Sequence, residues 1–123
     1  MASEDELRRL ALDLPEVVEA DDGVFRVRGK GILWPASDRE RPKEPRRRLP
    51  GVYVVRTVGL GEKQELMDAE PEIYFSTPHY DRYPAVLFRL AAISPDELGE
   101  LVTDSWRIQA PRTLVRAFDA ERS

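Results

Sequence analysis

Cysteine is absent from the 123-residue chain, and histidine occurs only once. Without cysteine the chain cannot form disulfides, thiolate zinc sites, iron–sulfur clusters or cysteine nucleophiles. A single histidine excludes the zinc motifs and iron triads that need two histidines. No apolar run approaches the roughly 20 residues that a helix needs to span a bilayer. We therefore expect no metal, no cofactor and no membrane partner.

The chain is the size of one domain, which we expect to span residues 1–123. Its 23 acidic and 19 basic residues give a net charge of −4, which disfavours non-specific binding to nucleic acids. Between residues 37 and 50, however, six basic and three acidic residues give +3 and leave −7 elsewhere. Nearly all the bases are arginine, which suits phosphate recognition, although a codon bias towards arginine explains the same composition.

Helices are predicted from capping residues and from apolar residues at helical spacing. They cover residues 3–14 and 62–70 and two stretches that begin at 94 and at 111. The first and third open on a serine followed three residues later by a glutamate, the capping-box pattern: Ser3 with Glu6, and Ser94 with Glu97.

Strands are predicted where β-branched and apolar residues gather or alternate, over residues 24–28, 32–34, 52–58, 73–76 and 85–91. The first two form a hairpin that turns at Gly29–Gly31, and Pro35 ends the second because proline cannot donate to the ladder. The order α-β-β-β-α-β-β-α-α predicts an α+β domain with a mainly antiparallel sheet and helices packed on one side. The side chains that we expect to be nearly fully buried are Leu87, Leu90, Leu101 and Val102.

Residues 37–50 contain three prolines and no apolar periodicity. We predict a long, exposed and mobile basic loop. Trypsin should cut it after Arg46, Arg47 or Arg48 before the domain unfolds.

Residues 70–80, with the sequence Glu-Pro-Glu-Ile-Tyr-Phe-Ser-Thr-Pro-His-Tyr, resemble the central signature of the MmcQ/YjbR family. Further matching segments extend the resemblance over essentially the whole chain: 14–17, 25–30, 83–87, 89–90, 106–107 and 110–112. The resemblance implies a frataxin-like, or double-wing, α+β fold and a DNA-binding protein. The basic loop at 37–50 looks like an insertion into the family pattern. Because the implied function follows from a likeness of fold, the residues must support it independently.

The first functional hypothesis is a nucleic-acid-binding module that binds duplex DNA weakly, with a Kd of about 10⁻⁴–10⁻⁶ M. One face and the tip of the predicted hairpin carry three bases, and a β-ribbon of this kind can enter a DNA groove. The alternative is a solvated outer face of an antiparallel sheet. The residues assigned to DNA are Arg26, Arg28, Lys30, Arg46, Arg47 and Arg48.

The second hypothesis is a pocket for a small planar ligand, because aromatic rings with nearby arginines suit such a ligand. The residues assigned to it are His79, Tyr80, Tyr83, Trp106 and Arg112. Core packing is the alternative role for Trp106 and for Trp34. His79 belongs to no recognisable catalytic pattern, and a triad cannot be read from Ser76 and Asp81 nearby. We therefore expect a non-enzymatic, monomeric, cytoplasmic protein.

Overall fold

A computed structural model describes residues 2–39, 41 and 43–122. The elements in chain order are α1 (Glu4–Leu12), β1 (Val17–Glu19), β2 (Phe25–Val27), β3 (Lys30–Asp38), β4 (Arg47–Arg56), α2 (Leu60–Ala69), β5 (Tyr74–Phe75), β6 (Ala85–Arg89), a 3-10 turn η1 (Leu90–Ala92), α3 (Pro95–Gln109) and α4 (Arg112–Arg122). The strands form one antiparallel sheet in the order β1-β2-β3-β4-β6-β5. This confirms the α+β class and adds β1, a three-residue strand that the sequence pattern did not reveal.

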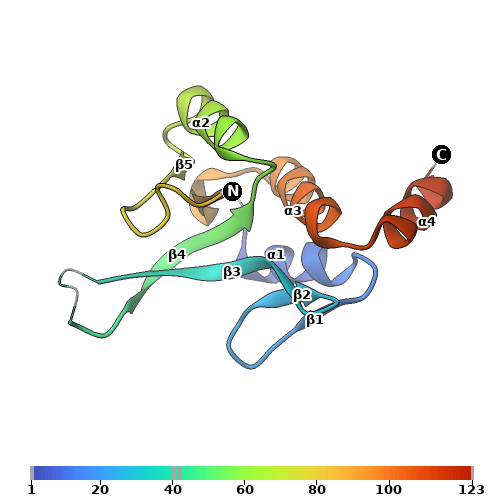
Figure 1. Ribbon diagram of the computed structural model, residues 1–123, viewed down its shortest axis with the longest axis horizontal. Helices are drawn as coiled ribbons and strands as arrows, with labels where there is room; N and C mark the ends of the chain where they lie inside the picture. The colour runs from blue at the N-terminus through green and yellow to red at the C-terminus, as the bar shows by residue number, and fades with distance from the viewer. Residues whose placement is uncertain (1, 40, 42, 123) are drawn as a thin grey trace.

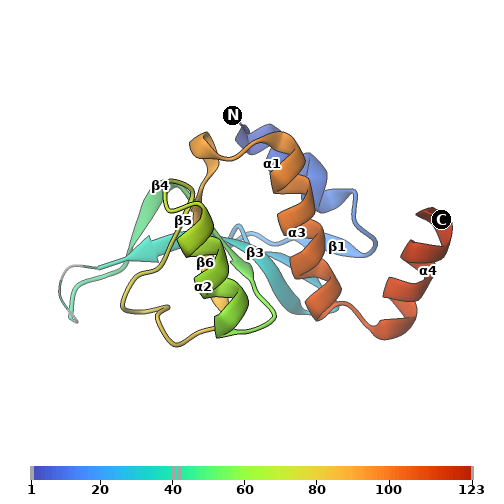
Figure 2. The ribbon, with the colours of Figure 1, turned by 90° about the horizontal axis from the view of Figure 1, so that it is seen from above.

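Helices α1 and α3 pack on one face of the sheet, and α2 lies beside α3 near the β5 edge (Figures 1 and 2). Helix α4 stands at one end of the molecule, while the β3–β4 hairpin projects from the other (Figure 1). We call the face away from α1 and α3 the open face. Within the described residues, no helix is long and apolar enough to cross a membrane.

The expected burial is confirmed for all four leucine and valine side chains, but they divide between two cores. Leu90, Leu101 and Val102 belong to the main core between the sheet and the helices. Leu87 belongs to a smaller core on the open face, with Val54 and Tyr80. Strand β6 is therefore covered on both faces, and this explains why residues 85–88 are all inaccessible to solvent.

An extra residue in β3 sets which side chains reach each face. Arg26 pairs with Gly31 and Phe25 with Leu33, so Ile32 is a β-bulge without a partner on β2. As a result Ile32 and Leu33, although adjacent, are both buried in the main core. Trp34 then falls on the open face, beside Val54.

Helix α3 supplies the hydrogen bonds that the bulge leaves unmade. The buried Ser105 hydroxyl donates to the Ile32 carbonyl at 2.7 Å and accepts from the Arg56 amide at 3.0 Å. The Gln109 side chain donates to the Gly31 carbonyl at 3.1 Å. Because buried backbone groups are costly to leave unpaired, these contacts fix the bulge in place.

Two predictions about the β3–β4 connection were wrong. Pro35 does not end its strand, because β3 continues to Asp38 along β4 after its pairing with β2 has stopped at Leu33. A strand edge without a neighbour tolerates a residue that cannot donate. The loop predicted over 37–50 is shorter than expected, since Ser37 pairs with Arg48 and Asp38 with Arg47. We call residues 37–50 the arm.

The strand pairing moves the expected first site of trypsin cleavage. Arg47 and Arg48 lie in β4, and Arg46 donates to the Ser37 hydroxyl at 2.9 Å. We expect the first cut after Arg39 or Lys43, which lie outside both strands. Mass spectrometry of fragments from brief digestion of the native protein identifies the site. A first cut after Arg46, Arg47 or Arg48 would show that the arm strands do not pair in solution.

Candidate functional site

The loop between β5 and β6 crosses the open face and forms an aromatic depression there. Tyr80 of this loop packs into the smaller core against Val54 and Leu87. A depression of about 390 Å³ lies beside it, and its lining residues are Trp34, His79, Tyr80 and Tyr83. The structure thus brings together three of the five residues assigned to the ligand pocket, and Trp34, for which core packing was the alternative, lines it as well.

Ring contacts hold this group in one arrangement. The Trp34 indole N–H donates to the Tyr80 hydroxyl at 3.1 Å. The His79 ring stands almost perpendicular to the Tyr80 ring, with centroids 4.7 Å apart. Tyr80 is 8% exposed, whereas Tyr83 is 43% exposed and His79 is also exposed. Tyr80 therefore anchors the depression, and His79 and Tyr83 present its accessible surface.

Lys63 and Arg56 hold the β5–β6 loop through hydrogen bonds. The Lys63 side chain, 2% exposed, donates from Nζ to the backbone carbonyls of Tyr80 and Tyr83. Burial lowers the pKa of Lys63, and the nearby Asp81 carboxylate partly opposes that shift. The Arg56 guanidinium donates to the Tyr83 hydroxyl and lies 5.0 Å from the centre of its ring.

Sequence reasoning missed Lys63, although a signal was present. Lysine is rarely buried, so a lysine in a short helix is normally read as exposed. Lys63 nevertheless precedes Leu66 and Met67 by three and four residues. This is the spacing of one helix face, and both residues pack against the main core.

Trp106 and Arg112 are not part of the depression, which corrects the predicted pocket. Trp106 is completely buried in the main core, where its indole N–H donates to the Pro15 carbonyl at 3.0 Å. Arg112 begins α4, at the opposite end of the molecule from the β5–β6 loop (Figure 1). Trp106 lies on the apolar face of its helix, and core packing, the alternative role stated for it, is therefore correct.

The first hairpin does not present a free basic face. Arg26 forms an ion pair with Asp22 at 2.9 Å, and Arg28 donates to Glu16 through Nη2 at 3.1 Å. These partners hold the pKa values of Asp22 and Glu16 below their usual range. Of the three bases assigned to this hairpin, Lys30 alone lacks an ion-pair partner within the described residues. Acidic residues close in space, which were not considered in the prediction, neutralise the other two.

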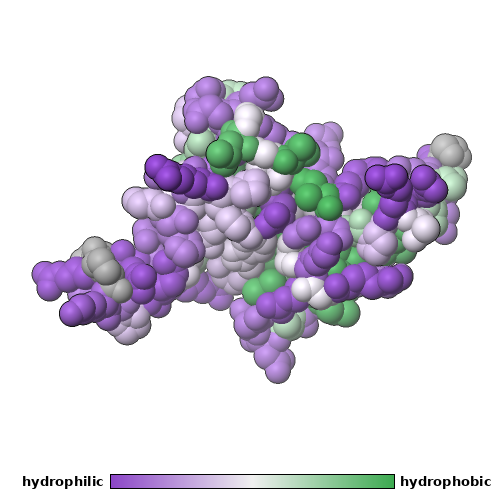
Figure 3. Space-filling view, in the orientation of Figure 1, coloured by the Kyte–Doolittle hydropathy of each residue, from purple (hydrophilic) through white to green (hydrophobic). Residues whose placement is uncertain are grey.

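The arm presents a different set of bases from the predicted triplet. Arg46 is held within the arm by the Ser37 hydroxyl and carbonyl. Arg48 donates to the Tyr53 hydroxyl at 3.0 Å and approaches Glu4. The exposed bases without an ion-pair partner in the described part of the arm are Arg39, Arg41, Lys43 and Arg47. Figure 3 shows the arm as a strongly hydrophilic projection.

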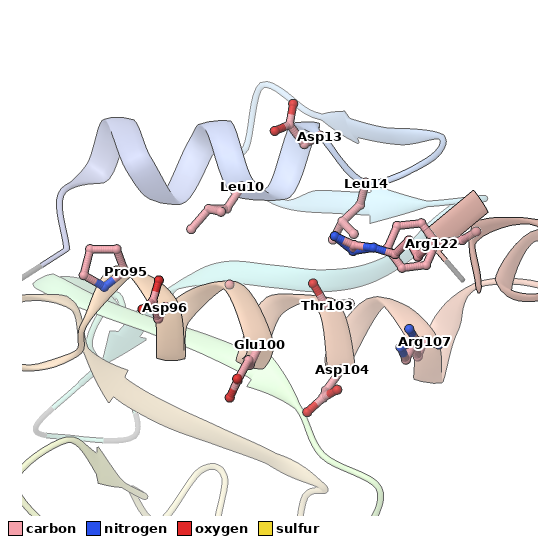
Figure 4. Close-up of a pocket in the computed structure, with 12 residues that line it drawn as sticks. Leu10, Asp13, Leu14, Pro95, Asp96, Glu100, Thr103, Asp104, Arg107 and Arg122 are labelled. Carbon is pink, nitrogen blue, oxygen red and sulfur yellow. The ribbon is translucent and has the colours of Figure 1, made fainter. Parts of the chain in front are cut away.

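A cavity of about 570 Å³ forms a groove between α1 and α3 that Phe118 of α4 borders. Leu10 and Leu14 line its α1 side, while Glu100 and Asp104 point away from α1 (Figure 4). Arg107 is already paired with Asp119 at 2.6 Å. Across the described residues, no group of three or more acidic or histidine side chains is placed to hold a metal ion. The described residues of the groove therefore offer no metal site of this kind.

Glu97 departs from its predicted role in a capping box. Ser94 caps α3 by accepting from the Glu97 amide, but the Glu97 carboxylate accepts from the Tyr74 hydroxyl at 2.6 Å. The neighbouring Glu97 carboxyl, through a shared hydrogen bond and its charge, raises the pKa of Glu70, and burial adds to the shift. Two carboxyl groups this close cannot both ionise without repulsion.

Replacing Glu70 by glutamine should therefore stabilise the protein at neutral pH. Because the folded-state pKa of Glu70 is raised, the wild-type pair contributes most below the ordinary glutamate pKa and loses that contribution as pH rises. The advantage of Glu70→Gln should be present at pH 7 and fade towards pH 4. Urea unfolding at both pH values measures it, with Glu65→Gln on the exposed side of α2 as the control. An advantage that does not change with pH would contradict the raised pKa of Glu70.

Comparison with known proteins places the sequence in a family. The sequence model of the family described as YjbR matches residues 12–108. The uncharacterized proteins Mb2600 of Mycobacterium bovis and Rv2570 of Mycobacterium tuberculosis are each 40% identical to this chain over 124 residues. Each match covers 96% of this chain and 96% of the relative. No solved structure matches.

Proposed function

The chain belongs to the YjbR family, and we propose that it is a nucleic-acid-binding member that holds the phosphate backbone with its arm. The observation that carries this proposal is the position of four exposed bases at the end of a projecting two-stranded segment, with Arg47 in β4 and the other three in the connection between β3 and β4. A two-stranded β-ribbon has the dimensions to enter the major groove of DNA. Arginine and lysine on such a segment reach phosphates without moving the body of the protein.

The net charge limits the strength of this interaction. The rest of the chain carries −7 and opposes the approach of a polyanion. Binding is therefore weak and depends on salt, because each neutralised phosphate releases counterions. Within this proposal the protein acts by binding alone, in the cytoplasm, without catalysing a reaction.

Salt-dependent binding to a duplex of about 20 base pairs tests the proposal. If the four exposed arm bases all contact phosphate, the log–log slope of affinity against salt should be about −3.6. Replacing Arg39, Arg41 and Arg47 by alanine should flatten it to about −1. The matched control replaces Arg26 and Arg28, which are already ion-paired, and should leave the slope unchanged. Absence of salt-dependent binding by the wild type would refute the proposal.

A small planar ligand in the aromatic depression is the second candidate function. The observation in its favour is the cavity of about 390 Å³ bordered by four aromatic side chains, two of them exposed. Cavities of about 300–1,000 Å³ with aromatic walls are typical of small-molecule sites. A thermal-shift screen with His79→Ala as the control variant tests this candidate. Hits that stabilise both proteins equally would exclude the depression as their site.

A further inference from the structure

The arm and the aromatic depression adjoin on the same face of the sheet. Trp34 of the depression lies two residues before Ala36, where β3 enters the arm. Ala36 and Tyr80 share the smaller core, and Leu49 from the returning arm strand packs against it. A chain-like ligand that contacts the arm bases would therefore pass directly beside the depression.

The depression offers ring faces and edges at fixed positions. The hydrogen bond from Trp34 to the Tyr80 hydroxyl sets the orientation of both rings. A Cβ placed at Gly31 would lie 3.6 Å from the Trp34 ring, so that ring packs along the backbone of its own strand. His79 and Tyr83 stay exposed beside it. A planar group can enter among these rings without rearrangement of the loop.

The charges near the depression favour an anionic ligand with a planar part. Arg56 lies against the Tyr83 ring, whereas the buried Lys63 ammonium faces backbone carbonyls and the nearby Asp81 carboxylate and is not accessible to a ligand. The exposed arm bases add positive charge at the far end of β3. A neutral aromatic molecule would use the rings and leave the arm without a role. A nucleotide strand uses both, because every nucleotide joins a flat base to a phosphate.

From this arrangement we infer that the depression holds an unpaired nucleobase of a single strand whose phosphates lie along the arm. This inference rests on the proposed function, since it assigns the arm to the same strand. Bases inside a duplex are stacked and paired, so their faces cannot reach His79 and Tyr83. A single strand presents those faces freely, and aromatic side chains stack on them with little regard to sequence.

Fluorescence anisotropy with a labelled single strand and a duplex of equal length tests this inference. We expect the single strand to bind at least about 5-fold more tightly, the gain from one stacked base. A variant with His79→Ala and Tyr83→Leu should lose about 5- to 100-fold in single-strand affinity and keep its duplex affinity. His79→Ala alone changes only an exposed ring, so it serves as a second variant if the double variant unfolds.

Intrinsic fluorescence provides an independent readout. Trp34 lines the depression, whereas Trp106, the other tryptophan, is completely buried. The single strand should quench the Trp34 emission, and Trp34→Phe should abolish the quenching. Equal affinity for both nucleic acids, with no effect of the depression variants, would overturn the inference and leave the proposed function intact.

A mononucleotide separates the two proposals if the wild type binds neither nucleic acid. That result would refute phosphate binding by the arm. Titration with thymidine monophosphate then tests the depression alone. Quenching of Trp34 that His79→Ala weakens would support a base site, and the absence of quenching would overturn it.

Discussion

Replacing Trp106 by alanine is expected to lower the free energy of unfolding by about 3–5 kcal/mol. The ring is completely buried, and its centroid lies 4.9 Å from that of Phe118 on α4. Alanine would leave a cavity among α3, α4 and the turn before β1. It would also remove the indole donor from the Pro15 carbonyl. Urea unfolding followed by circular dichroism measures the loss.

Trp106→Phe provides the matched control, because it keeps most of the ring volume and removes only the indole N–H. We expect a smaller loss than with alanine. The folded fraction of either variant should retain binding at the depression, since Trp106 is not one of its lining residues. A loss below about 1 kcal/mol for alanine, the size of an ordinary substitution, would show that the site is less tightly packed than described.

Replacing Lys63 by methionine is expected to destabilise the protein and to loosen the β5–β6 loop. Two backbone carbonyls would lose their charged donor, and each would keep one backbone donor, the Tyr83 amide for Tyr80 and the Ala85 amide for Tyr83. Hydrogen bonds to a charged group contribute about 1.5–3 kcal/mol each. Removal of the buried charge offsets part of this cost, because the lowered pKa shows that burial disfavours the ammonium form. The depression should lose its shape, since both carbonyls belong to residues that line it.

Two measurements check this expectation. Urea unfolding reports the loss of stability, and brief trypsin digestion reports the loop through the rate of cleavage after the exposed Arg82. The control is Lys30→Met, which removes an exposed lysine instead. If Lys63→Met and Lys30→Met match in both stability and cleavage, Lys63 does not support the loop.

The elements that could be predicted are those whose signals are local. The capping box at Ser3 forms as expected, with both reciprocal hydrogen bonds, because its two partners lie within one helical turn. The continuation of β3 past Pro35 depends on its pairing with β4, in which Ser37 lies opposite Arg48 and Asp38 opposite Arg47. The Glu97 carboxylate likewise accepts a hydrogen bond from Tyr74, 23 residues away, instead of forming the expected capping box. The local spacing of residues does not reveal such partners from other elements.

In the candidate site, too, local contacts could be predicted and contacts between elements could not. His79, Tyr80 and Tyr83 come together because one short loop carries all three. Trp106 resembles them in chemistry, but its helix turns it into the core. The paired state of Arg26 and Arg28 depends on acidic residues in the preceding turns, which the alternation of the strand could not reveal. Trp34 and Lys63 belong to the site because both form hydrogen bonds with Tyr80, which is distant from them in the sequence.

The bulge at Ile32 determines how the depression responds to a change in chain length. Side chains alternate along a regular strand, so the loss of one residue there transfers every later side chain to the other face. Loss of Ile32 itself has the opposite result, because it removes the bulge and restores the alternation that follows the pair of Arg26 and Gly31. Leu33 would stay opposite Phe25 in the main core, and Trp34 would stay on the open face. The Ser105 hydroxyl would lose the Ile32 carbonyl as its acceptor. Homologues that lack one residue at this point, with every aromatic residue retained, should therefore keep the depression.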